Sequence, residues 1–543
     1  MQETEFNLLD EKWICVVGAG CEAEQVSLTD ALLKAHTFAD FGGELPAQDV
    51  AVLRLLLAIL HTVFSRVDEN GIACPLETVD DAFDRWKALW DRGSFPERPL
   101  LEYLTAWHER FWLFHPDRPF YQVNDAKIGT TYTTAKLDGE LSESNNKVKL
   151  FPVQTGDAKT HMDYGEAARW LLYQNAFDDN SSKPKGKNLP APGIGWLGKL
   201  GLVQAVGKNL FETLMLNLTL LDDNGQLWTE GNRPVWELDE PRSQERTEIA
   251  IPGNQAELLT LQSRRLLLQR EDGRVTGYSL LGGDFFPKED STGEMMTIWA
   301  LREDKKAGTA KYFQPRRHNP DRLIWQEFSA IITGSEVRCP GIVKWLKELQ
   351  SAGCLPRHQM LTFRIASVQY GSSDYFATDV FADELSLHAN LLSELGFIWQ
   401  NRIVEEIDLC EQCAKQIGWL AANLDRAAGD RKGSHQGLAR ERFYSAVDMP
   451  FRSWLASLDA EMDDAQRDDK VFAWRAQARA IALKLGADMI AGIDSTAFTG
   501  RTLKEKKNGK DIEYHYSAPE AWLSFQAGLN KTYPAGKTRE VKG

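Results

Sequence analysis

The chain is poor in cysteine and has none of the common short motifs of a catalytic centre. Its seven cysteines, among 543 residues, are an odd number at irregular spacing, which argues against a disulfide framework. No G-x-S-x-G nucleophile elbow and no H-E-x-x-H zinc motif occurs. The sequence therefore gives no support to a disulfide-rich secreted protein, to a serine hydrolase or to a zinc protease.

Only one closely spaced cysteine pair is present, Cys410 and Cys413. It lies in a strongly helical stretch, and no second cysteine pair or histidine pair is near it in the sequence. Because a structural zinc site needs four converging ligands, we expect these thiols to serve helix packing and predict no metal site.

Long apolar runs and an excess of positive charge are also lacking. No segment reaches the roughly 18 uninterrupted apolar residues that indicate a membrane span. The start, MQETEFNLLDEKW, lacks the basic region and apolar run of a secretory signal, so we expect a cytoplasmic protein without membrane contact. The 63 basic and 78 acidic side chains give a net charge of −15. Any polyanion must therefore bind at a local concentration of positive charge.

One such concentration lies between residues 180 and 211, which contain no acidic side chain. Its five lysines are Lys183, Lys185, Lys187, Lys199 and Lys208. The first part is rich in Gly and Pro and is expected to be a loop; residues 181–191 are called the lysine loop below. Cationic side chains beside open backbone N–H groups favour an anion-binding surface, and nucleic acids are the commonest polyanions. The alternative is a solvated loop of lysines without a ligand. Two further basic clusters occupy residues 311–322 and 501–510.

The segment from Gly193 to Lys199 matches both G-x-G-x-x-G and G-x-x-x-x-G-K. It has Leu200 where a P-loop has the Ser or Thr that binds Mg²⁺. Both motifs also require a preceding buried strand, and the proline-rich KPKGKNLPAP cannot form one. A nucleotide-binding enzyme built on this segment is thus an alternative hypothesis that the sequence does not favour.

The apolar periodicity predicts an α+β fold in two parts. Residues 1–378 are expected to form a large mixed α/β domain, with a buried helix near residues 50–64, amphipathic helices over residues 80–93 and 99–114, and strands on both sides of a Glu-Asp-Gly turn. Beyond residue 380 every substantial segment has a 3.6-residue apolar period, which is typical of an antiparallel helical (four-helix) bundle, residues 379–543.

Several segments resemble one known family in their order and spacing. They include FNLLDEKWI at the start, RPFYQV, the stretch from Asn145 to Phe151, GIGWLGKLG and ELLTLQSRRLLL. On these segments the chain is similar to the CasA family, the large subunits of type I-E CRISPR Cascade surveillance complexes. The resemblance implies a non-enzymatic subunit without a cofactor that recognises the protospacer-adjacent motif in double-stranded DNA, helps to open the duplex and recruits a helicase–nuclease. Its partners would be the guide-RNA-containing Cascade subunits. A scaffold subunit without direct DNA contact is the remaining alternative.

The resemblance also assigns roles to three regions. The lysine loop takes the place of the family's motif-recognising loop, and Tyr370–Tyr375 the place of a wedge that enters the duplex, without the glutamine of some relatives. The third region would anchor the subunit near the guide's 5′ handle. The residues implied for DNA binding are Lys183, Lys185, Gly186, Lys187, Ser373, Asp374 and Tyr375, and those implied for anchoring are Asn145, Asn146 and Phe151.

Overall fold

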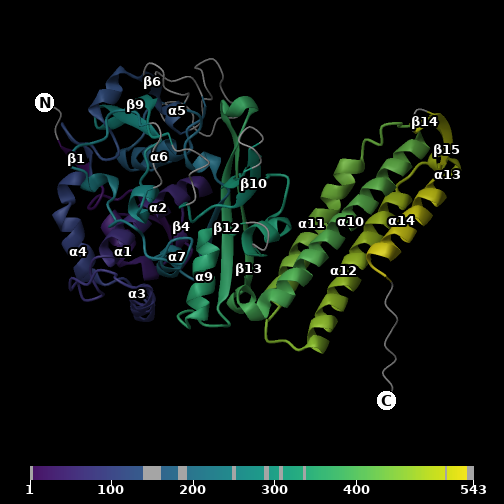
Figure 1. Cartoon of the computed structure of the whole chain (residues 1–543). Coiled ribbons are helices and arrows are strands. Elements are labelled where there is room, and N and C mark those ends of the chain that lie inside the picture. Colours follow the sequence, from purple (N-terminus) through teal and green to yellow (C-terminus); the bar gives the residue numbers. More distant parts are fainter. Residues whose placement is uncertain are drawn as a thin grey trace. The chain divides into compact units, whose positions relative to one another are not determined.

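The protein is described by a computed structural model that covers residues 4–138, 160–180, 192–246, 252–285, 293–304, 310–333, 338–507 and 510–534. The chain divides into two compact units. The first comprises Met1–Arg357 with Leu361–Leu385, and the second comprises His358–Met360 with Ser386–Gly543. The first unit mixes helices and short sheets and the second is mainly helical (Figure 1), so the predicted α+β class is confirmed. The domain boundary predicted after residue 378 falls inside strand β13 (Ala377–His388).

Helix α2 (Pro46–Phe64) forms the centre of the first unit. Almost every one of its side chains is buried, because the sequence is apolar around the whole helix. By length and composition it is the one helix among the described residues that could cross a membrane, but 94% of its most apolar window is buried inside the unit. The buried helix predicted near residues 50–64 is thus confirmed.

The remaining helices of the first unit begin and end at residues suited to these positions. Ser27 accepts a hydrogen bond from the Asp30 N–H at the start of α1, and Thr78 forms a capping box with Asp81 at the start of α3. These helices are α1 (Leu28–Leu33), α3 (Val79–Arg92), α4 (Glu97–Ala106), α5 (Thr134–Leu137), α6 (Tyr164–Phe177), α7 (Leu210–Asn217), α8 (Gln255–Leu259) and α9 (Gly341–Ser351).

Short strands form small sheets around these helices, and the sheet orders are β1-β5, β3-β2-β4, β6-β9-β8, β13-β12-β7 and β10-β11. The strands are β1 (Glu5–Asn7), β2 (Ile14–Gly18), β3 (Ala23–Val26), β4 (Phe38–Phe41), β5 (Trp112–Phe114), β6 (Thr130–Thr133), β7 (Leu202–Val206), β8 (Arg264–Glu271), β9 (Arg274–Gly282), β10 (Trp299–Asp304), β11 (Ala310–Pro315) and β12 (Met360–Tyr370). The predicted Glu-Asp-Gly turn joins β8 to β9, with Asp272 and Gly273 at φ +49° and +74°, as a two-residue hairpin turn requires. The single helix predicted over residues 99–114 was wrong: α4 ends at Ala106, and β5 pairs with β1.

The second unit is an antiparallel bundle of four long helices that lie side by side (Figure 1). Its core contains an aromatic cluster of Phe451, Trp454 and Trp474. Cys410 is buried, and the Tyr533 hydroxyl donates to its Sγ atom at 3.3 Å. The elements are α10 (Phe397–Ala428), α11 (Gln436–Ala456), α12 (Asp464–Ala491), α13 (Ser495–Thr499), α14 (Ala518–Thr532) and the strands β14 (Arg501–Lys507) and β15 (Lys510–Tyr516). The basic cluster 501–510 is thus part of a hairpin, which the helical periodicity did not predict.

Candidate nucleic-acid interface

The end of the β12–β13 hairpin carries the three residues predicted to enter the duplex. The chain reverses between Gly371 and Phe376, where the Gly371 N–H donates to the Phe376 carbonyl at 2.8 Å. Ser373 and Asp374 both adopt the left-handed conformation, with φ +58° and +60°. Non-glycine residues rarely have positive φ, so the surrounding contacts must hold this turn in place. We call residues 372–375 the hairpin tip.

Arg317 is one of these contacts, and it binds the carboxylate of Asp374. Its guanidinium forms two parallel hydrogen bonds with the Asp374 carboxylate, at 2.9 and 3.2 Å. The same guanidinium lies 5.8 Å from the centroid of the Tyr370 ring. Asp374 therefore fixes the turn, whereas Ser373 is exposed and Tyr375 keeps 43% of its surface accessible to a ligand.

The hairpin tip is joined directly to the beginning of the lysine loop. Asn180, the last described residue before that loop, donates from its backbone N–H to the Asp374 carbonyl at 2.8 Å. Its side-chain Nδ2 donates to the Ser373 carbonyl at 3.0 Å across 193 residues of sequence. The sequence analysis assigned the lysine loop and the hairpin tip to DNA contact separately. In the structure the beginning of the loop is therefore adjacent to the tip on the surface.

A single buried arginine, Arg264 at the start of β8, holds both ends of the lysine loop. Before the loop, its guanidinium pairs with the Asp178 carboxylate and donates to the Asp179 carbonyl at 3.2 Å. After the loop, it donates to the Gly193 carbonyl at 2.5 Å. The Arg264 and Asp178 side chains are 1% and 0% exposed, and Asp179 pairs with buried Lys136. These contacts fix the separation of the loop's two ends, and sequence reasoning did not single out any of the side chains involved.

Gly195 and Gly198 are required by the close packing of these loop ends, whereas Gly193 has a positive φ of +66° and no atom within 4 Å of its Cβ position. A Cβ atom on Gly195 would lie 2.3 Å from the Ala176 carbonyl oxygen, and one on Gly198 2.4 Å from the Tyr370 hydroxyl. Three residues of 3₁₀ helix, Leu197–Lys199, follow and lead into strand β7. A P-loop requires an α-helix starting at its lysine, so this segment does not have that geometry.

Tyr370 links the hairpin to the helix that precedes the lysine loop. Its hydroxyl donates to the Phe177 carbonyl at the end of α6, at 2.6 Å. Burial raises the pKa of this phenol well above its ordinary value, so the donor proton is retained across the physiological pH range. This bond and those of Asn180 make the loop entry and the hairpin one rigid support.

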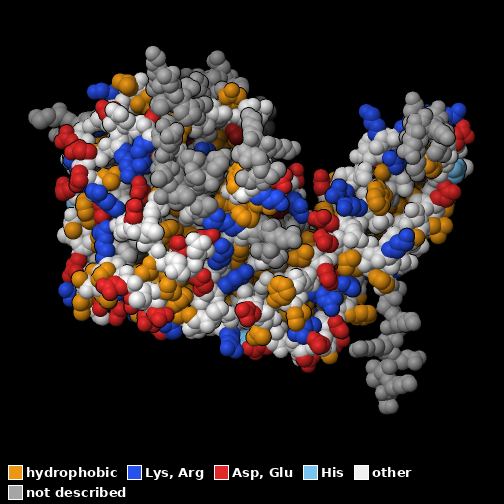
Figure 2. All heavy atoms as spheres, viewed as in Figure 1, with side chains coloured by type: hydrophobic (Ala, Val, Ile, Leu, Met, Phe, Trp, Pro, Cys, Tyr) orange, Lys and Arg blue, Asp and Glu red, His pale blue; other side chains and the backbone are white. Residues whose placement is uncertain are grey.

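The basic cluster of residues 311–322 is largely neutralised by local acids. Arg316 and Arg322 both pair with Glu327, and Arg317 pairs with Asp374. Figure 2 likewise shows basic and acidic side chains intermixed over the face in view. This cluster is therefore a weaker candidate for phosphate contact than the lysine loop.

Several predicted residues cannot be placed against this geometry. Lys183, Lys185, Gly186 and Lys187 of the lysine loop, and the anchoring residues Asn145, Asn146 and Phe151, lie outside the described residues. In the part of the chain that is described, no group of three or more His, Cys, Asp or Glu side chains is arranged to hold a metal ion.

Comparison with known proteins identifies relatives over nearly the full length. The family described as CRISPR-associated protein Cse1 matches residues 7–485. The CRISPR-associated protein CasA/Cse1 of Thermus thermophilus is 28% identical over 508 residues, which are 88% of this chain and 93% of that protein. The crystal structure of Thermobifida fusca Cse1 superposes with a TM-score of 0.82 at 26% identity, covering 98% of this chain and 99% of the other. Cse1 from Acidimicrobium ferrooxidans has the same fold, with a TM-score of 0.76 at 23% identity over 98% of this chain and 100% of that one.

Proposed function

Because the chain belongs to the CRISPR-associated Cse1 family, we propose that it is the large, non-catalytic subunit of a type I-E RNA-guided surveillance complex. In this role it recognises the protospacer-adjacent motif in double-stranded DNA, helps to open the duplex and recruits a helicase–nuclease. Its other partners are the guide-RNA-containing subunits. A solved structure titled as a CRISPR RNA-guided surveillance complex contains a chain of the same fold, with a TM-score of 0.61 at 16% identity over 90% of this chain and 99% of that one.

The contact of Asn180 with Ser373 and Asp374 is the observation that carries this proposal. A subunit that recognises a motif and separates the adjacent base pairs needs a cationic element that binds the DNA phosphate backbone. It also needs a rigid projection beside this element. The lysine loop supplies the first and the hairpin tip the second. Their shared support lets motif binding position the tip at the neighbouring base step.

A motif library tests the function directly. The complex is reconstituted with guide RNA, with and without this chain, and duplex binding is measured against targets whose flanking motif is randomised. We expect enrichment of a small set of motifs only when the chain is present. Equal binding of all motifs would instead indicate a scaffold subunit without DNA recognition.

The hairpin tip gives a prediction about strand opening. Replacing Ser373, Asp374 and Tyr375 together with Ala removes the exposed tip and its bond to Arg317. Separating a base step costs a few kcal/mol, which an inserted or stacked side chain offsets. We expect slower opening of an intact duplex with little change in motif binding, and recovery on a target with a pre-melted bubble. Equal losses on duplex and bubble targets would leave only general DNA contact at the tip.

Phe151 gives a prediction about assembly. An aromatic side chain that does not belong to the chain's own core can bury its apolar surface in a partner or against a base. We expect Phe151→Ala to leave the melting temperature of the isolated chain nearly unchanged and to weaken its binding to the rest of the complex. Phe111→Ala is the matched control: Phe111 is fully buried, and truncating a core Phe costs roughly 3–5 kcal/mol of stability. A similar stability loss in both variants would assign Phe151 to the chain's own core.

A further inference from the structure

A second basic site lies in the first unit, around the RPFYQV segment that the proposed DNA contacts do not use. An open pocket of about 50 Å³ is lined by Arg118 and Phe120 of this segment, by Arg110, and by Trp236, Arg242 and Gln262. A water molecule needs roughly 10–15 Å³ of such space, so the pocket holds a group of about four or five heavy atoms. That is the size of one tetrahedral oxyanion.

The arginines around the pocket outnumber the acids that pair with them. Arg118 pairs with Glu240 at 2.9 Å, but this glutamate is 81% exposed and is free to move towards water. Arg110 has no ion pair or hydrogen bond from its side chain among the described residues. Burial, followed by the charge of Arg118, lowers the pKa of Arg110, while the charges of Glu240 and Asp239 act in the opposite direction.

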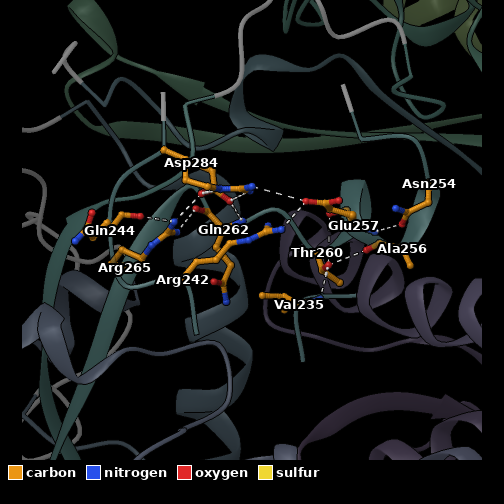
Figure 3. Close-up of polar contacts among 11 residues, drawn as sticks. Val235, Arg242, Gln244, Asn254, Ala256, Glu257, Thr260, Gln262, Arg265 and Asp284 are labelled. Atoms are coloured by element: carbon orange, nitrogen blue, oxygen red, sulfur yellow. Dashed lines mark hydrogen bonds and ion pairs between the residues drawn. The ribbon is translucent and has the colours of Figure 1, made fainter. Parts of the chain in front are cut away.

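Arg242 also belongs to a network of ion pairs beside the pocket, in which positive charges exceed negative ones (Figure 3). There the Asp284 carboxylate binds Arg246 and Arg265, at 2.9 and 2.6 Å. Glu257 binds Arg242 at 2.7 Å and lies 3.8 Å from Arg246. Three arginines thus share two carboxylates, and Arg242 is the member of this network that reaches the pocket.

Gln262 adds a neutral donor to the same pocket. Its backbone N–H and carbonyl are used by the Asp284 and Arg265 network. The residue is only 6% exposed, yet across the described ranges its side-chain amide makes no hydrogen bond. An amide that lines the pocket without a protein partner is available to donate its N–H to a ligand.

We propose that this pocket binds a phosphoryl group. The forked guanidinium donors of Arg110, Arg118 and Arg242 suit the several oxygens of a phosphate, and the Gln262 amide supplies a fourth donor. Phe120 and Trp236 exclude water from one side, which strengthens the charge interactions. The phosphoryl group belongs either to a small phosphate compound or to a nucleic-acid strand, because the pocket opens to the surface.

Titration calorimetry on the full chain tests this site with inorganic phosphate as the probe. We expect saturable binding that Arg110→Gln weakens by at least about tenfold, as expected for loss of a charge-assisted hydrogen bond. Arg242→Gln should weaken it as well. Arg98→Gln is the matched control, because Arg98 lies on nearby α4, is 70% exposed and pairs with Glu102. Circular dichroism checks that each variant is folded.

Competition then identifies the source of the phosphoryl group. Displacement of phosphate by a nucleoside 5′-monophosphate but not by an unphosphorylated oligonucleotide supports a terminal phosphate. Displacement by that oligonucleotide supports a phosphodiester of a strand. Absence of saturable phosphate binding, or equal affinity in the wild type and Arg110→Gln, overturns the site. Neither result bears on motif recognition, which the library experiment measures separately.

Discussion

Arg264→Met is expected to destabilise the first unit by roughly 3–5 kcal/mol, the cost of leaving a buried charge without its partner. Methionine keeps much of the side-chain length but removes the guanidinium that pairs with the Asp178 carboxylate. That carboxylate is 0% exposed, so it cannot recover solvation without local unfolding. The carbonyl of Gly193 loses its donor at the same time. Urea denaturation followed by tryptophan fluorescence measures the loss.

Arg317→Met is the control for this change, because it breaks a bidentate Arg–Asp pair in the same region. The Arg317 and Asp374 side chains are 36% and 33% exposed, and pairs at the surface contribute about 0–1 kcal/mol. Combining Arg264→Met with Asp178→Asn should recover part of the lost stability, since the second change removes the unpaired charge. Equal losses for Arg264→Met and Arg317→Met would show that the buried pair has no special role in holding the loop ends.

Local signals in the sequence predicted the elements of the fold well. The all-round apolar pattern of α2 predicted a buried helix, and the Glu-Asp-Gly turn fixed the hairpin of β8 and β9, because both depend on neighbouring residues. The hairpin of β14 and β15 was missed because its neighbouring residues gave a misleading signal. The helical periodicity on both sides dominated the interpretation, although Asn508-Gly509 is the dipeptide favoured in two-residue hairpin turns.

The candidate interface could be predicted only in its parts. The lysines and the Tyr370–Tyr375 segment were found from composition and family resemblance, but nothing local indicates that Asn180 bonds to Ser373 and Asp374. That contact depends on how strand β12 packs beside α6, which involves segments far apart in the chain. The role of Arg264 could not be predicted for the same reason. An arginine in a strand is ordinarily exposed, whereas this one is buried and binds a carboxylate and carbonyl groups from other elements.

Replacing Lys183, Lys185 and Lys187 together with Ala is expected to weaken duplex binding by the complex and to flatten its dependence on salt. Each neutralised phosphate contributes about −0.9 to the slope of log affinity against log salt concentration, so three contacts predict a slope reduced by about 2.7. Immediately before the loop, Asp178 pairs with the buried Arg264 and Asp179 pairs with the buried Lys136. Filter binding across a salt series measures the slope.

The same variant distinguishes contact with phosphates from recognition of bases. If the lysines bind only phosphates, affinity should fall by a similar factor on preferred and disfavoured motifs; if they contact base edges, the difference between motifs should narrow as well. Ala at Lys12, Lys34 and Lys127, three exposed lysines elsewhere in the first unit, removes the same total charge and is the matched control. An unchanged slope in the loop variant, or an equal change in the control, would contradict a direct role for the lysine loop. A reduced slope that is specific to the loop variant would place the duplex backbone against the lysine loop. Arg264 and Asn180 hold the two ends of this loop beside the hairpin tip.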